Sequence, residues 1–188
     1  GLATSEDGKK WRYEKIVLDE EHHLSYPYVF SHEGNFYMIP ESGKANRLYL
    51  YRAVSFPFEW ERVSTLLEGV FGDHGIVQHE GCWYLFANSN IYKNNTLNLY
   101  YSDDLLGKFI EHPMSPIVSG DASKARPGGR MIFWDGGIIR YTQNCKKEYG
   151  KSVNAFKITQ LTKEKYSEQK ISLKPIVKSG NKGWNRHG

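Results

Sequence analysis

The segments PYVFSHEGNFYMIP (residues 27–40), HGIVQHEGCWYLFA (74–87) and GRMIFWDGGIIRYT (129–142) share one pattern, and this pattern decides the fold. Each contains an apolar strand, an acidic residue followed by glycine, and a second strand rich in aromatic or aliphatic residues. The turn glycines Gly34, Gly81 and Gly136 recur after 47 and then 55 residues. A repeat of this length built from short strands is typical of the blades of a β-propeller.

A second pair of strands is expected after each hairpin, within residues 47–67, 97–118 and 152–172. Apolar and polar residues alternate in these segments, as Leu48 and Leu50 illustrate, and this alternation predicts half-buried strands. The repeat therefore predicts three complete four-stranded blades. Residues 3–18 match the second half of a blade, and another blade is expected to begin near Trp184. We predict one all-β domain over residues 1–188, truncated at both ends and part of a longer polypeptide.

Composition excludes several classes of protein. Of the 188 residues, 39% are hydrophobic and 14% aromatic, which suffices for a substantial core. The formal net charge of +4 is mild and the basic residues are scattered, which disfavours a nucleic-acid-binding surface. No apolar run approaches the ~18 residues that a membrane-spanning helix needs. Cys82 and Cys145 lack the spacing of metal ligands, and two free thiols are favoured over a disulfide. The compartment is left open.

Several strings point to a known family. Residues 5–11 read Ser-x-Asp-Gly-x-x-Trp, and residues 26–30 read Tyr-Pro-Tyr-Val-Phe. The strings Ile-Pro-Glu-Ser at 39–42 and Arg-Pro-Gly-Gly-Arg at 126–130 are more specific, because strand formation does not require them. The chain resembles the five-bladed propellers of family 43 glycoside hydrolases. It resembles more closely the N-terminal domains of plant glucosamine inositolphosphorylceramide transferases and their bacterial homologues. The resemblance implies a five-bladed propeller that faces carbohydrate, without implying hydrolysis.

Asp73 and Glu41 are the candidate catalytic residues. Asp73 precedes the inner strand of the second complete blade between glycines that leave room for a ligand, and the resemblance places there an aspartate that orients or tunes the acid. The alternative is that Asp73 caps its own turn. Glu41 follows Pro40, which cannot donate to a strand ladder, so the strand should end or bulge and direct Glu41 toward a groove. The alternative is a solvated loop glutamate.

Two carboxylates that the resemblance leads us to expect are absent. Residues 23–27, where the family places an aspartate base, contain no acid. Residues 125–128 carry Arg126 at or near the place of the general acid. Ordinary hydrolysis by a carboxylate pair is therefore disfavoured, although chemistry that uses Glu41 and Asp73 stays open. The fork of Arg126 suits an anion such as a uronate, a phosphate or a sugar nucleotide. Alternatively, Arg126 pairs with a nearby acid for structure.

Other polar residues lie at equivalent places in the blades. Amides at the ends of the aromatic strands offer both donors and acceptors to sugar hydroxyls. Aromatic and histidine side chains near the starts of the inner strands are also candidates, although in strands they belong more often to the core. The remaining predicted substrate-binding residues are Tyr26, His23, His74, Asn88, Gln143, Asn144 and His187. The sequence predicts no metal site and no cofactor.

Three functions are compatible with this pattern. The first is a domain that acts on glycans or assists their transfer, either as a divergent glycosidase or beside a glycosyltransferase. The second is a propeller that binds a carbohydrate or sugar nucleotide without catalysis. The third is a structural or protein-docking propeller. The first requires Glu41 and Asp73 to face one cavity. The second requires a funnel lined by Arg126, Gln143 and aromatic residues with one acid inside. The third requires these side chains to point outward or to be occupied in structural contacts.

Overall fold

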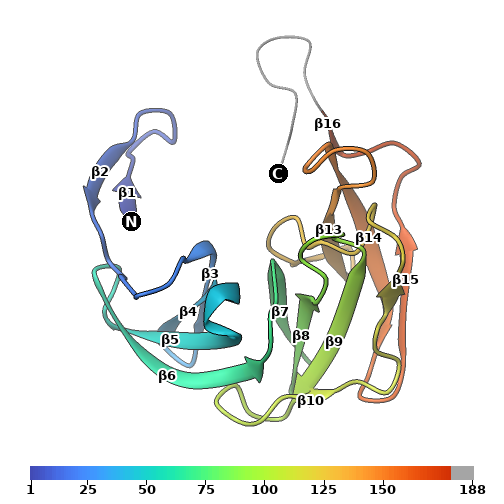
Figure 1. Ribbon diagram of the computed structural model, residues 1–188, viewed down its shortest axis with the longest axis horizontal. Helices are drawn as coiled ribbons and strands as arrows, with labels where there is room; N and C mark the ends of the chain where they lie inside the picture. The colour runs from blue at the N-terminus through green and yellow to red at the C-terminus, as the bar shows by residue number, and fades with distance from the viewer. Residues whose placement is uncertain (179–188) are drawn as a thin grey trace.

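The computed structural model describes residues 1–178, which form three antiparallel sheets and a separate two-stranded hairpin (Figure 1). The positions of Trp184 and His187 lie outside the described residues. The only regular helix among residues 1–178 is one 3₁₀ turn, η1 (Gly43–Ala45). No helix in that part of the chain is long and apolar enough to cross a membrane.

Each sheet is built from strands that are consecutive in the chain. The first sheet has the order β3 (Ser25–His32), β4 (Asn35–Glu41), β5 (Arg47–Ser55), β6 (Glu59–Glu68). The second contains β7 (His74–His79), β8 (Cys82–Asn88), β9 (Thr96–Ser102), β10 (Ile110–Glu111) and β11 (Val118–Ser119). The third contains β12 (Ile132–Trp134), β13 (Gly137–Asn144), β14 (Ser152–Leu161), β15 (Tyr166–Lys170) and β16 (Val177–Lys178). The three predicted four-stranded units are thus confirmed, with β11 and β16 as short additions that pair with β9 and β14.

The first hairpin of each sheet closes through the predicted acidic-glycine turn. Glu33 and Gly34 have φ angles of 47° and 76°, and the pairing of His32 with Asn35 leaves these two residues as the whole loop. The corresponding residues of the second and third sheets also have positive φ. Positive φ at both central positions is the requirement of a type I′ turn, whose twist matches that of the flanking strands. Glycine meets this requirement without steric cost.

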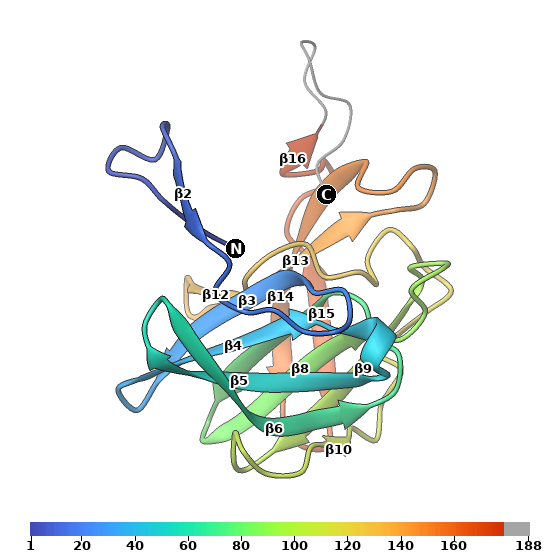
Figure 2. The same ribbon diagram turned by 60° about the vertical axis from the view of Figure 1, so that its left-hand side comes forward.

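The sheets pack face to face in the order of the chain (Figure 2). One core cluster joins the first and second sheets, and a second cluster joins the second and third. All seven residues of β8 are buried because this strand contributes to both clusters. Trp83 and Leu85 pack toward the first sheet, whereas Tyr84 and Phe86 pack toward the third. Successive blades therefore associate through side chains rather than through shared strands, as in a propeller.

The hairpin of β1 (Leu2–Thr4) and β2 (Arg12–Lys15) stands away from the three sheets (Figures 1 and 2). Its two strands pair only with each other among the described residues. The segment predicted to be the outer half of an earlier blade thus forms a two-stranded unit, and its place in a blade stays a prediction. The segment after the hairpin returns to the first sheet, where Leu18 packs against Met38 and its neighbours on the face that points away from the second sheet.

Replacing Gly34 by alanine should destabilise the domain, because a Cβ would be added at a φ of 76° where no neighbouring atom lies within 4 Å. The loss should be about 1 kcal/mol and should come from backbone strain alone. Glu33→Asn is the matched variant, since asparagine tolerates the left-handed conformation that Glu33 adopts. Urea unfolding measures both. Equal destabilisation by the two variants would contradict the type I′ assignment.

Candidate functional site

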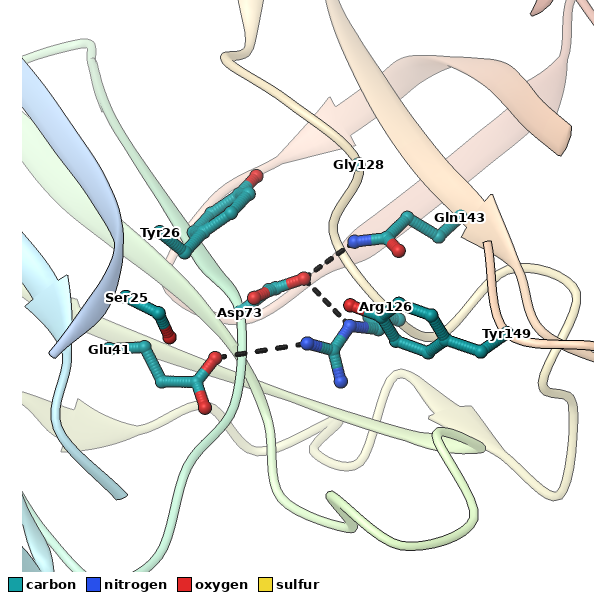
Figure 3. A pocket seen from close by; sticks show the side chains of 8 residues that line it. All are labelled: Ser25, Tyr26, Glu41, Asp73, Arg126, Gly128, Gln143 and Tyr149. Carbon is teal, nitrogen blue, oxygen red and sulfur yellow. Dashed lines mark hydrogen bonds and ion pairs between the residues drawn. The ribbon is translucent and has the colours of Figure 1, made fainter. Parts of the chain in front are cut away.

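A pocket of about 290 Å³ lies where the inner ends of the three sheets converge (Figure 3). The first sheet contributes residues from β3 and β4, the second contributes the residue just before β7, and the third contributes the segment before β12, the end of β13 and the loop after it. The lining residues are Ser25, Tyr26, Glu41, Asp73, Arg126, Gly128, Gln143 and Tyr149. Five of these eight residues, from three different blades, are candidate site residues predicted from the sequence: Tyr26, Glu41, Asp73, Arg126 and Gln143.

Asp73 forms the floor of this site and is only 2% exposed. Its Oδ2 atom accepts a hydrogen bond from Arg126 Nε at 2.7 Å and a second one from Gln143 Nε2. Both partners come from the third blade, 53 and 70 residues further along the chain. Asp73 therefore bonds to side chains of another blade, which differs from the alternative in which it caps its own turn. A buried carboxylate needs such partners, because an unpaired charge is costly inside a protein.

Arg126 faces an oxygen with each of its three side-chain nitrogens. Nε binds Asp73, Nη1 donates to Asn94 Oδ1 at 2.7 Å, and Nη2 lies 3.8 Å from Glu41 Oε2. The guanidinium also lies 4.9 Å from the ring centre of Tyr149. Burial acts against the charged form, but the carboxylates outweigh it and raise the pKa of Arg126. The structural alternative, pairing with a nearby acid, is therefore realised, and it leaves this arginine little capacity to bind an external anion.

The chain around Arg126 is fixed by its backbone. Gln143 N donates to Arg126 O at 2.9 Å, and Gly128 N donates to Tyr141 O at 3.0 Å. A Cβ on Gly128 would lie 2.8 Å from Gln143 N, so only glycine permits this close approach. The string Arg-Pro-Gly-Gly-Arg thus extends the inner edge of the third blade along β13 and directs Arg126 toward Asp73.

Glu41 lines the pocket as the last residue of β4, next to Pro40, which lies opposite a bulge in β3. The pairing of β4 with β3 is interrupted by a bulge between Ser25 and Tyr28, and Tyr26 in that bulge has a φ of 46°. The side chain of Glu41 is 21% exposed. Burial, followed by the interaction with Asp73, raises the pKa of Glu41 to about 7, against the opposing effect of Arg126. The prediction that Pro40 turns Glu41 toward a groove agrees with this geometry.

Gln143 and Tyr26 present unused polar atoms. Gln143 is 3% exposed, and its Nε2 donates to Asp73 and to Pro127 O, while its Oε1 has no partner among the described residues. The hydroxyl of Tyr26 also lacks a partner in that part of the chain. Because both donors of the amide are engaged, the orientation of Gln143 is fixed with its acceptor free.

His74 supports the pocket from below without lining it. It is fully buried, lies edge-on to the Tyr26 ring at 5.8 Å, and has its Nε2 2.9 Å from Ile39 O. Burial lowers the pKa of His74 to about 4, so its imidazole is neutral near pH 7 and donates from Nε2 to the carbonyl oxygen. The prediction that His74 binds substrate directly therefore has no support in its position.

Three other predicted residues do not line the pocket. His23 is exposed in the segment before β3. Asn144 is half-buried at the end of β13, where its side chain accepts a hydrogen bond from Lys146 N. Asn88 is buried, and its Nδ2 lies 3.3 Å from Asn94 Oδ1, so it supports the residue that holds Arg126. His187 lies outside the described residues.

Ser25, Asn94 and Tyr149 belong to the site or its support but were not predicted from the sequence. Asn94 and Tyr149 lie in loops, where no alternation of apolar and polar residues predicts which side chains face the site. The Asn-rich composition of residues 88–96, which follow the aromatic strand of the second blade, was the one available signal for Asn94. Among residues 1–178 there is no group of three or more His, Cys, Asp or Glu side chains that could hold a metal ion.

The sequence matches the family described as glucosamine inositolphosphorylceramide transferase 1, N-terminal, over residues 1–187. The chain belongs to this family. It is 42% identical to glucosamine inositolphosphorylceramide transferase 1 from Oryza sativa subsp. japonica and 38% identical to the protein of that name from Arabidopsis thaliana. Each match covers 98% of this chain, and 26% and 25% of the relative. The chain thus spans about a quarter of the length of these curated relatives.

Solved structures of glycoside hydrolases share the fold. A family 117 glycoside hydrolase from Zobellia galactanivorans matches 93% of this chain and 55% of its own, with a TM-score of 0.69 at 16% identity. The family 43 subfamily 1 enzyme from Xanthomonas citri complexed with xylotriose matches 83% of this chain and 57% of its own, with a TM-score of 0.61 at 11% identity. At such low identity the likeness establishes the all-β, propeller-type fold and nothing about activity.

Removal of Arg126 should destabilise the domain strongly, because Asp73 would remain buried without its counter-charge. We expect Arg126→Met to lower the free energy of unfolding by about 3–5 kcal/mol. Adding Asp73→Asn should recover part of the loss. Arg12→Met, which breaks an exposed ion pair with Glu14, is the control and should cost under about 1 kcal/mol. Chemical unfolding measures all three. Similar losses for Arg126→Met and Arg12→Met would show that the buried pair is not formed.

Glu41 should titrate near pH 7, which carbon NMR of its carboxyl group measures directly. Because this pKa is raised above the ordinary 4.5, the folded state binds more protons than the unfolded state between about pH 4.5 and 7. The contribution of Glu41 to stability therefore falls as the pH rises through this window. Glu41→Gln should remove that decline and so gain stability relative to the wild type at pH 8. A midpoint near 4.5 would contradict the assignment.

Proposed function

We propose that this domain binds a carbohydrate in the pocket between its blades and that this binding serves glycan transfer. The observation that carries the proposal is a 290 Å³ cavity whose lining includes the partly exposed Glu41 carboxyl and Gln143, whose buried Oε1 has no partner among the described residues. Small-molecule sites are concave and orient their ligands with a few such groups. The aromatic rings of Tyr26 and Tyr149 supply apolar surface beside them.

Glu41 and Asp73 take different roles in this proposal. Asp73 is buried and held by Arg126 and Gln143, so it positions these two side chains. Glu41 is partly exposed, and its pKa of about 7 lets it both accept and donate a proton at neutral pH. Hydrolysis by two cooperating carboxyls needs both to be available on either side of one bond. One available carboxyl supports assistance of transfer better than hydrolysis.

The family supports a link to transfer, because its curated relatives are named as transferases that involve glucosamine and inositolphosphorylceramide. This chain corresponds to about a quarter of their length, so the proposal concerns one glycan-binding step within a longer polypeptide. We also propose a five-bladed ring. The face-to-face order of three blades, together with a hairpin that stands beyond the first, supports an arc about a common axis (Figure 1).

A second candidate function is carbohydrate binding without catalysis. The commitment of Asp73 to Arg126 and Gln143 favours it, since Glu41 is then the one pocket carboxyl free to meet a ligand. Both candidates use the same pocket and differ only in whether the proton on Glu41 is transferred.

Glycans and sugar nucleotides should therefore be screened for binding and for turnover with the wild type, Glu41→Gln and His23→Ala. We expect binding by the wild type, unchanged binding by the control His23→Ala, and binding within a few-fold by Glu41→Gln. Loss of turnover of at least about 100-fold in Glu41→Gln would support an acid–base role. Turnover that survives this change would contradict that role, and binding without turnover by the wild type would favour the second candidate. Binding of no carbohydrate would refute both.

A further inference from the structure

We infer that the pocket selects an uncharged sugar ring that lies against Tyr149 and donates a hydroxyl to Gln143, and that it discriminates against sugars carrying a carboxylate or phosphate. This inference rests on the proposed function and specifies the class of ligand. It also runs against the expectation from the sequence that Arg126 binds an anionic group of the ligand.

The charges of the pocket disfavour an anionic ligand. The formally charged side chains that line the pocket in the described chain are Glu41, Asp73 and Arg126. Two carboxylates against one guanidinium leave one net negative charge when Glu41 is ionised. Nε and Nη1 of Arg126 already donate to Asp73 and Asn94, and Nη2 faces Glu41. A second anion would therefore compete with an existing buried partner and be repelled by the other carboxylate.

The pocket wall contains an unpaired hydrogen-bond acceptor. Gln143 lines the pocket, and its Oε1 is buried and has no partner within residues 1–178. The amide cannot be flipped to exchange Oε1 with Nε2, because Nε2 donates hydrogen bonds to Asp73 (Figure 3) and to Pro127 O. A buried acceptor left unmatched costs free energy, and a ligand hydroxyl relieves this cost whereas a carboxylate or phosphate oxygen cannot. The pocket thus favours ligands that donate.

The ring of Tyr149 supplies an apolar surface for a sugar ring. Tyr149 lines the pocket, is 46% exposed, and has its ring held near the Arg126 guanidinium at 4.9 Å. This contact fixes the ring at the rim and leaves part of it open to a ligand. A volume of about 290 Å³ lies at the lower end of the ~300–1,000 Å³ range of small-molecule sites, which suits one sugar ring.

The test compares matched neutral and anionic monosaccharides at pH 8 and moderate ionic strength, using glucose with glucuronate, galactose with galacturonate, and mannose with mannuronate. Saturation-transfer NMR and calorimetry give the affinities. We expect at least one neutral sugar to bind about tenfold or more tightly than its uronate. Glu41→Gln removes the net negative charge and should narrow this ratio by several-fold. A uronate that binds as well as or better than its neutral partner, or binding of none of the six while another glycan binds, overturns this inference alone. The proposed function is overturned only if no glycan or sugar nucleotide of the wider screen binds either.

Tyr149→Ala tests the stacking surface, and Tyr149→Phe should retain it. We expect about a tenfold loss of neutral-sugar affinity for alanine and less than a threefold change for phenylalanine. The matched control is Tyr92→Ala, because Tyr92 is 91% exposed, does not line the pocket, and lies in the loop that also carries Asn94. Unfolding curves establish that the variants are folded. An unchanged affinity in folded Tyr149→Ala would contradict the placement of the ligand.

Discussion

Asp73 accepts hydrogen bonds from Arg126 and Gln143, and these bonds join the second blade to the third at the inner ends of their strands. The pair is almost completely buried, so neither charge can be removed without leaving the other unsolvated. Apolar packing holds the outer parts of these blades together, but it does not determine how their inner ends meet. The ion pair joins them, and backbone hydrogen bonds of Arg126 and Gly128 to the end of β13 hold the arginine in place for it.

The same interaction separates the two carboxyls of the pocket. Asp73 has a cation and an amide as fixed partners, whereas Glu41 lies 3.8 Å from the outer nitrogen of Arg126 and is partly exposed. Burial and the neighbouring Asp73 carboxylate favour the protonated form of Glu41. Two acids in different environments can take different roles, one structural and one chemical. The short bond from Arg126 to Asp73, against a separation of 3.8 Å from Glu41, is what makes their environments different.

The local features of this molecule could be predicted from its sequence. The turn glycines and the alternation of the strands gave the three blades, because each hairpin satisfies its own backbone and presents its own apolar face. Pro40 indicated a break in regular pairing beside Glu41, which the structure places in the opposite strand as the bulge of β3. The choice between an anion-binding and a structural Arg126 could not be made in advance, since its partner Asp73 lies 53 residues away on another blade.

Tyr149 and Asn94 were missed because loop positions carry no period. His23 was placed at the site because it lies near an inner strand, but the bulge at Tyr26 brings Ser25 and Tyr26 to the pocket instead.

The fold and the site of this protein carry different information. Its likeness to glycoside hydrolases of 11–16% identity is a likeness of backbone, and backbone geometry explains why residues from three blades meet at one place. The chemistry depends on which side chains occupy that place. The resemblance led us to expect a proton-donating glutamate where this chain has Arg126, and that difference inverts the local charge. An arginine there neutralises Asp73 and lies against the ring of Tyr149, and the Asp73 carboxylate in turn holds Gln143, whose acceptor oxygen stays buried and unpaired among the described residues. Under the proposed function this charge pattern serves to hold a sugar, and Glu41 is the partly exposed acid beside it.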